Sequence, residues 1–379
     1  MRGDYKDLIR DCLAKLDKID INEKTWDDII DEYELEYSSD HLRKLSYGFR
    51  MYRDAFNEDS NESEEFIKLK KERQKISDLR VEANKQIRNL ARIENVIDLI
   101  KDEINNLSNN KPFISNFKLK QSSSGKDGIL CLGDIHDFLV IDNSVNKYNH
   151  DICIRRLNDI TDKTIEYGLT NDIDKLHIIG LGDYISGTIH NSLKIINQEE
   201  IAHQIVNTSE VLAQCIAKLA EHFYCTVTIT IGNHEAIEMS KDDRRNKNNY
   251  TKLIKEFLKL RLDKHPNVIF LENTFNDNEV ALLEVKNLKV AACHGDKINR
   301  NKVKEQLEMV TNTELDMILY GHIHNHQRYT LYNTEVFVNG SLCGSDEYAM
   351  GKKLCSPPSQ TMIIIDENGI LCDYVIKVK

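Results

Sequence analysis

Five short polar blocks, each directly after a short apolar run, constrain the fold of this chain more than any other feature. The apolar runs are rich in Ile, Leu and Val and predict strands. Glycine in each block allows a tight turn. Because ligands of α/β sheets bind at the carboxyl ends of the strands, the blocks predict one shared site. They are Gly133-Asp134-Ile135-His136, Gly182-Asp183-Tyr184, Gly232-Asn233-His234-Glu235, His294-Gly295-Asp296 and Gly321-His322-Ile323-His324.

Residues 128–379 alternate between such runs and amphipathic stretches, which predicts an α/β domain with a mixed sheet or two sheets. The expected strands are 129–132, 176–181, 226–231, 268–271, 280–285, 290–293, 317–320 and 362–365. The expected helices are 151–167, 199–222, 250–263 and 299–310.

The blocks supply carboxylate, imidazole and amide donors. This mixture is expected for Mn²⁺, Fe or Zn²⁺, whereas an all-oxygen shell suits Mg²⁺ or Ca²⁺. Any one block is common by chance, and a lone histidine after a strand is more often a hydrogen-bonded structural residue. Five blocks in this order favour a metal site over five structural turns.

The order D-x-H, G-D, G-N-H-E, H-G-D and G-H-x-H resembles the signature of the calcineurin-like metallophosphoesterases, over about residues 128–379. The resemblance implies a four-layer αββα domain, hydrolysis of phosphoric esters and two divalent metal ions. Mn²⁺ is the expected metal, with Fe, Zn²⁺ or Mg²⁺ as alternatives. The implied catalytic residues are His234, which protonates the leaving oxygen or stabilises developing charge, and Asp183. The implied ligands are Asp134, His136 and His324 for one metal, Asn233, His294 and His322 for the other, and Asp183 between them.

Five residues near the blocks have two interpretations each. Glu235 either orients the preceding histidine or faces solvent. Asp296 either supports a ligand or forms a turn. His190 either reaches a phosphate or lies in a surface loop. Arg244 and Arg245 belong to a basic loop that either clamps a phosphate backbone or is solvated.

Residues 1–58 predict a small helical domain. Thr25 is expected to cap a helix, with acidic residues in its first turn. A polar break at residues 38–40 precedes a second helix that carries three arginines and a lysine. This outline fits a helix-turn-helix that binds DNA or, alternatively, a docking or oligomerisation module with a solvated basic face.

Residues 64–108 predict one long helix or coiled coil, because apolar residues recur with a 3.5-residue period. Such a stripe must be buried, either in a homodimer or along the same chain's catalytic domain. Residues 109–127 are polar and predict a linker. One set of heptad positions is Leu69, Ile76, Ala83, Leu90, Ile97 and Ile104, and the other is Glu72, Leu79, Gln86, Ile93, Ile100 and Leu107.

The formal net charge of −11 excludes a protein that binds nucleic acid through overall positive charge, although a local basic patch or a metal pair can still do so. The nine cysteines are scattered without C-x-x-C pairs, which favours a reducing compartment. No stretch has the length of a signal peptide or membrane span. We therefore expect a cytoplasmic protein with no membrane partner, in the host cytoplasm if phage-encoded.

The helical start ahead of such a domain resembles phage and prophage phosphoesterases described as DNA-repair-exonuclease-like. This favours a phosphodiester hydrolase that acts on nucleic acid. DNA is the expected partner, and the expected activity is that of an exonuclease or endonuclease. The alternative is a phosphatase or phosphodiesterase for a nucleotide, cyclic nucleotide or phosphoprotein. A DNA-binding scaffold with a dispensable phosphoesterase domain is disfavoured, because the ligand set is intact.

Overall fold

The computed structural model describes residues 5–17, 24–56, 64–107, 124–189, 193–237, 246, 248–272, 275–353 and 355–379. The chain forms two compact units, Met1–Lys85 and Gln86–Lys379. The larger unit contains two sheets, and the smaller is helical, as the sequence predicts. Among the described residues, no helix combines the length and the apolar character that a membrane span requires.

The first sheet has six strands in the order β13-β12-β1-β4-β5-β6. The pairs β1–β4, β4–β5 and β5–β6 are parallel, whereas β12 runs antiparallel to both β1 and β13. The three central parallel strands therefore have their carboxyl ends at one edge of the sheet. The strands are β1 (Asp127–Leu132), β4 (Lys175–Gly180), β5 (Tyr224–Ile229), β6 (Val268–Phe270), β12 (Ser359–Asp366) and β13 (Gly369–Lys377).

The second sheet has five strands in the order β10-β11-β9-β8-β7. Strand β9 is parallel to both β8 and β11, and the outer pairs β7–β8 and β10–β11 are antiparallel. A short hairpin of β2 (Ile141–Asp142) and β3 (Lys147–Tyr148) stands apart from both sheets. The five strands are β7 (Val280–Val285), β8 (Leu288–Cys293), β9 (Met317–Tyr320), β10 (Gln327–Leu331) and β11 (Thr334–Val338).

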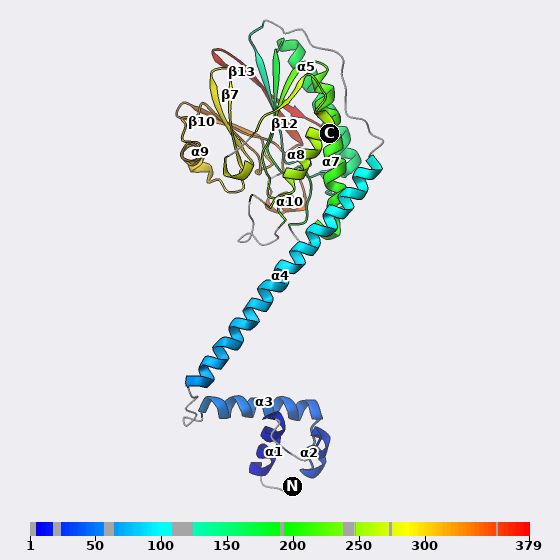
Figure 1. The fold of residues 1–379 in the computed structure, drawn as a ribbon, viewed down its shortest axis with the longest axis vertical. Helices are drawn as coiled ribbons and strands as arrows, with labels where there is room; N and C mark the ends of the chain where they lie inside the picture. Colours follow the sequence, from blue (N-terminus) through cyan, green and yellow to red (C-terminus); the bar gives the residue numbers. More distant parts are fainter. Residues whose placement is uncertain are drawn as a thin grey trace. The chain divides into compact units, whose positions relative to one another are not determined.

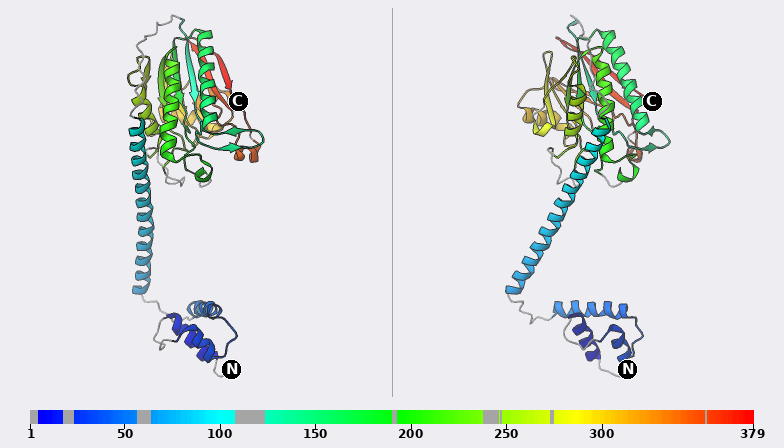
Figure 2. Two further views of the ribbon diagram at one scale, coloured as in Figure 1. Left: turned by 90° about the vertical axis from the view of Figure 1, so that its right-hand side faces the viewer. Right: turned by 45° about the vertical axis from the view of Figure 1, so that its right-hand side comes forward.

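The two sheets and their helices form the four-layer αββα domain (Figures 1 and 2). Side chains of successive residues point to opposite faces of a strand. In β1, Leu130 therefore joins the core beneath α5, α7 and α8, and Ile129 joins the core between the sheets. Beyond the second sheet, α9 contributes Val303 and Leu307 to a third core. The helices are α5 (His150–Asn171), α6 (Leu193–Ile196), α7 (Ile201–Ala220), α8 (Thr251–Leu262), α9 (Val303–Thr311) and α10 (Glu347–Lys352), with 3₁₀ turns η2 (Asn276–Asn278) and η3 (Arg300–Lys302).

All eight expected strands are present, but the sequence analysis missed β10, β11, β13 and the hairpin. Strand β10 alternates between exposed and half-buried residues, and β13 is mostly half-buried at the sheet edge. Strands of this kind carry little apolar signal. Their pairing with β11 and β12 depends on residues that lie elsewhere in the chain.

The smaller unit begins with three helices, α1 (Tyr5–Asp17), α2 (Trp26–Glu32) and α3 (Ser39–Phe56). Thr25 caps α2, as predicted, and its side chain accepts a hydrogen bond from the Asp28 N–H. The buried centre of the three helices is small: Cys12, Ile29 and Leu42.

The cationic side chains of α3 form ion pairs with nearby carboxylates. Arg43 and Lys44 both pair with Asp40, at 2.7 and 2.6 Å. Arg50 and Arg53 both pair with Asp17, at 3.3 and 2.8 Å. These pairs reduce the positive potential that a DNA-reading helix needs. Arg43 and Lys44 remain 54% and 73% exposed, so a solvated face for a docking module stays a prediction. The exposed large apolar side chains of α3 are Leu45, Tyr47, Phe49, Met51 and Tyr52.

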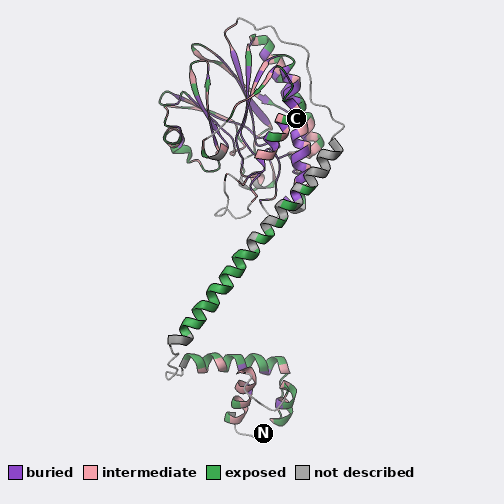
Figure 3. Cartoon of the chain, viewed as in Figure 1, coloured by how far each residue is buried: buried purple, intermediate pink, exposed green. Residues whose placement is uncertain are grey.

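Helix α4 (Glu64–Leu107) is the predicted long helix. On its heptad stripe, Leu69, Ile76 and Leu79 are 63%, 54% and 65% exposed, and Figure 3 draws this stretch as exposed. Val96, off the stripe, is buried in the core of the larger unit. In proteins most of the stability of a helix comes from packing of its apolar face. We propose that a second copy of the chain covers the stripe, since a heptad pattern fits another helix with the same period.

Light scattering after gel filtration tests this proposal. We expect twice the mass of one 43.9 kDa chain, and a monomer when Ile76→Glu and Leu79→Glu are combined. Val81→Glu is the matched control, because Val81 is also apolar and 67% exposed but lies off the stripe. A wild-type monomer at micromolar concentration contradicts the proposal.

Candidate metal centre

The turns after five strands bring the predicted ligand residues together. Asp134 and His136 follow β1, Asp183 follows β4, and Asn233 follows β5 in the first sheet. The second sheet supplies the remaining residues, His294 after β8 and the pair His322 and His324 after β9. Each of the seven has a side-chain atom within 4.0 Å of another member of the set.

Five of these residues have backbone in the left-handed region, which non-glycine residues seldom adopt. The φ angles of Asp134, His136 and Asp183 are 49°, 50° and 54°, and those of His322 and His324 are 68° and 60°. Such a conformation is unfavourable by on the order of 1–3 kcal/mol per residue and clusters at functional sites. Backbone hydrogen bonds between the first two turns, such as His136 N–H to the Asp183 carbonyl at 3.0 Å, hold it in place.

One half of the centre surrounds His294. Its Nδ1 donates to the Leu181 carbonyl at 2.8 Å, so the neutral ring has a bare Nε2. That Nε2 faces three further acceptors: Asn233 Oδ1 at 2.9 Å, Asp183 Oδ2 at 3.1 Å and His322 Nδ1 at 3.2 Å. Converging lone pairs at these distances repel one another unless a cation lies among them.

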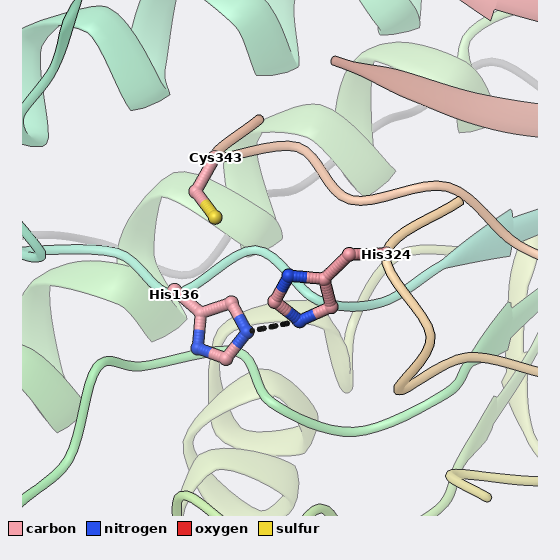
Figure 4. Close-up of side chains that lie close together, drawn as sticks. All are labelled: His136, His324 and Cys343. Carbon is pink, nitrogen blue, oxygen red and sulfur yellow. Dashed lines mark hydrogen bonds between the residues drawn. The ribbon is translucent and has the colours of Figure 1, made fainter. Parts of the chain in front are cut away.

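The other half surrounds His136. Its Nε2 lies 3.1 Å from His324 Nε2 (Figure 4) and 3.8 Å from Asp183 Oδ2. Asp134 Oδ1 approaches His324 Nε2 to 3.5 Å. Asp183 Oδ2 therefore faces both halves, as a bridging ligand must.

The donor set fits two divalent cations. Asp134 Oδ1 is buried without a hydrogen-bond partner among the described residues, and a buried polar atom is unfavourable when it has none. Atoms bound to a cation at about 2.1 Å lie roughly 3 Å from one another, which matches the shortest contacts above. Figure 4 also shows Cys343 beside this half, and burial raises the pKa of its thiol to about 12.

The electrostatics of the buried site favour positive charge between the carboxylates. Burial opposes ionisation of Asp183, but the histidines around it, His294 first, hold its pKa well below the usual range. Burial likewise opposes protonation of His294, but the Asp183 carboxylate raises its pKa to about 10. The carboxylates therefore attract a proton or a metal ion to the same place.

Glu235 does not face solvent; it is fully buried beneath the Asp183 turn. Its carboxylate accepts the backbone N–H groups of Tyr184 at 2.5 Å, Ile185 at 3.2 Å and Asp183 at 3.2 Å. Burial and the Asp183 charge raise its pKa to about 8, while the N–H groups oppose that rise. Glu235 therefore shapes the turn that presents the shared ligand.

His234 lies at the rim of the cluster. Its ring Nδ1 contacts the Ser186 carbonyl at 2.7 Å, which makes Nδ1 the donor, and its Nε2 lies 4.0 Å from Asp183 Oδ2. The ring stands edge-on to His136, with centroids 4.4 Å apart. With its side chain 17% exposed, His234 can meet both the site and a substrate.

The remaining predicted residues are less informative. Asp296 is exposed in the turn after β8. His190, Arg244 and Arg245 lie outside the described residues.

Three supporting residues carried no motif that the sequence analysis used. Ser341 Oγ donates to the Asp134 carbonyl at 3.0 Å. Gln360 on β12 accepts the Gly133 N–H at 2.9 Å. Asp137 is fully buried and accepts from His150 and Thr208, both at 2.8 Å. Two of them had a usable signal: Asp137 directly follows the first block, and Ser341 lies in a Gly-Ser turn that follows the final histidines.

The fold and this centre define a metal-dependent phosphoesterase. The profile of the Calcineurin-like phosphoesterase family matches residues 128–326, more than half of the 379-residue chain. The chain belongs to the calcineurin-like phosphoesterase family.

Known proteins similar to this chain include the SPbeta prophage-derived uncharacterized protein YonJ of Bacillus subtilis (strain 168). It is 23% identical over 313 residues, which cover 79% of this chain and 76% of the relative. Among solved structures, an archaeal phosphodiesterase is 16% identical over 65% of this chain and 99% of its own, with a TM-score of 0.35. Vacuolar Protein Sorting 29 from Cryptosporidium parvum is 14% identical over 67% and 92%, with a TM-score of 0.34.

Gly232 tests how closely the ligand turns must approach. A Cβ at this position would lie 2.1 Å from the backbone nitrogen and 2.3 Å from Oδ1 of Asp183. We expect Gly232→Ala to displace the shared ligand and to lower both metal content and phosphoesterase activity by at least tenfold. The measurements are elemental analysis and hydrolysis of bis-p-nitrophenyl phosphate.

The matched control is Gly351→Ala in α10, where a Cβ meets nothing within 4 Å. It should retain wild-type metal and activity. Equal behaviour of the two variants would contradict the close approach of the Asp183 and Asn233 turns.

Proposed function

We propose that this phosphoesterase is a two-metal phosphodiester hydrolase that acts on nucleic acid, with DNA as its first candidate substrate. The observation that carries the two-metal part is Asp183 Oδ2, which faces His294 Nε2 at 3.1 Å and His136 Nε2 at 3.8 Å. One carboxylate between two histidine clusters suits a pair of cations about 3.5–4 Å apart.

The ligand assignment follows the two halves of the centre. His136, His324 and Asp134 would hold one cation. Asn233, His294 and His322 would hold the other, with Asp183 shared between them. Mn²⁺ is the proposed metal, because the donors mix oxygen and nitrogen. When bound, such a pair supplies Lewis-acid stabilisation of the phosphoryl oxygens and activates water for in-line attack.

The chain's own residues would complete the reaction. The hydrogen bond from His234 Nδ1 to the Ser186 carbonyl fixes the ring, so Nε2 is the nitrogen that faces the cluster. A proton on Nε2 would be given to the leaving oxygen as the phosphorus–oxygen bond breaks. Glu235 would keep Asp183 in place through the backbone of its turn.

Two observations support a nucleic-acid substrate. The prophage-derived relative matches 79% of this chain, so the likeness extends beyond the catalytic domain. The segment that leaves His294 carries the exposed cations Lys297, Arg300 and Lys302, of which Lys297 pairs with Glu279 at 3.5 Å. Cationic side chains on such a segment suit a phosphate backbone. This segment belongs to the catalytic domain, so we assign the backbone contacts to that domain.

Hydrolysis of end-labelled single- and double-stranded DNA by the Mn²⁺-loaded protein tests the proposal. Bis-p-nitrophenyl phosphate and a panel of nucleotides run beside the DNA. We expect DNA cleavage that is abolished in Asp183→Ala, together with loss of bound metal, because both cations share that ligand. Inert DNA with rapid turnover of one nucleotide would instead support the small-substrate enzyme.

A second variant isolates the proton donor. We expect His234→Asn to lower kcat by about 10²–10⁴-fold, the usual contribution of a general acid, while metal content stays at the wild-type level. Elemental analysis and steady-state kinetics measure the two quantities. Loss of metal from this variant would assign His234 to the ligand set.

A further inference from the structure

A sulfur atom lies against one half of the proposed centre. Three donor atoms lie within 4.8 Å of one another, one each from His136, His324 and Cys343. Figure 4 shows Sγ of Cys343 directed toward the two imidazole rings. None of the five sequence blocks contains this cysteine, which lies 19 positions after His324.

The thiol contacts Ser341 Oγ at 3.1 Å and donates to the Gly344 carbonyl at 3.5 Å, a hydrogen bond that coordination would replace. Cys343 is fully buried, in the loop that follows β11. Its own carbonyl and that of Leu342 accept hydrogen bonds from the buried Arg156, at 3.0 and 2.9 Å. Leu342 N–H and Ser341 Oγ both donate to the Asp134 carbonyl, at 3.0 Å each. The loop that carries the thiol is therefore bonded to the backbone of a proposed ligand.

A second observation, independent of the sulfur, indicates a cation at the same place. Asp134 Oδ1 is fully buried and has no hydrogen-bond partner among the described residues. It faces His324 Nε2 at 3.5 Å and His136 Nε2 at 4.0 Å, both too long for good hydrogen bonds. The unsatisfied carboxylate oxygen and the thiol thus face the same pair of histidines.

We propose that Cys343 is a ligand of the cation held by His136, His324 and Asp134, so that this half of the centre is a mixed oxygen, nitrogen and sulfur site. Coordination forms one metal–sulfur bond and releases the thiol proton to solvent, because a coordinating thiol is deprotonated. Thiolate donors select Zn²⁺ and Fe over Mg²⁺ and Mn²⁺. The two halves of the centre then differ in metal preference, with the harder ion in the half around His294.

The inference rests on the proposed ligand set. A Co²⁺ titration tests the ligand set and the role of Cys343 separately. The full-length protein, stripped of metal and kept anaerobic, is titrated with Co²⁺ while its absorption is recorded. Visible d–d bands report cobalt bound by the centre as a whole. A near-ultraviolet charge-transfer band reports a cobalt–thiolate bond and needs no activity.

We expect both signals from the wild-type protein. Cys343→Ser should lose the charge-transfer band and keep the d–d bands, and its Zn²⁺ affinity should fall by on the order of 10–100-fold, the range seen when groups supporting a metal site are removed. Cys225→Ser is the matched control, because Cys225 is equally buried but lies within β5. It should keep both bands.

Wild-type d–d bands without a charge-transfer band would overturn the role of Cys343 and leave the ligand set standing. Absence of every cobalt band would instead overturn the ligand set itself, and the inference with it. The wild-type spectrum decides the question even if a cysteine variant fails to fold.

Discussion

The convergence of imidazole nitrogen and carboxylate oxygen atoms around Asp183 is the constraint on which the rest of the site depends. His294 Nε2 and His136 Nε2 approach the same oxygen from two sides, at 3.1 and 3.8 Å. Such an arrangement is unfavourable without positive charge, so contacts from the surrounding protein must keep these side chains in place. It does so with left-handed backbone at five ligand positions and with the buried carboxylate of Glu235, which accepts three N–H groups of the Asp183 turn.

Packing between the two sheets determines whether the site exists at all. The carboxylates and Asn233 come from the first sheet, whereas three of the histidines come from the second. Apolar side chains such as Ile129, Leu319 and Phe337 fill the space between the sheets and set their separation. Close-packed interiors have little free volume, so this core transmits the position of one sheet to the other. Metal affinity and the stability of the domain are therefore linked.

Substrate choice rests on features outside the metal cluster, because the same metal pair hydrolyses monoesters and diesters. The arginines of α3 in the N-terminal unit pair with carboxylates, which weakens their positive potential. The exposed apolar residues of α3 and α4 suit protein contacts better than nucleic acid. The cations that follow His294 belong to the catalytic domain itself, and a difference in metal preference between the two halves would add a further level of control.

The sequence by itself determined the eight strands with strong apolar runs, the long helix and the seven residues that meet at the strand ends. These features are local: a strand, its glycine turn and its donors occupy about ten consecutive positions. Tertiary structure decided the rest, because the remaining partners are distant in sequence. Gln360 bonds Gly133, which is 227 positions away, and Arg156 holds the carbonyl of Cys343 from a distance of 187. The edge strands β10 and β13 could not be predicted from the sequence either, because a half-exposed segment becomes a strand only when it pairs with a neighbouring strand. The pattern of residues can place donors at the ends of strands, but only the packing of two sheets decides which buried thiol or carboxylate faces them.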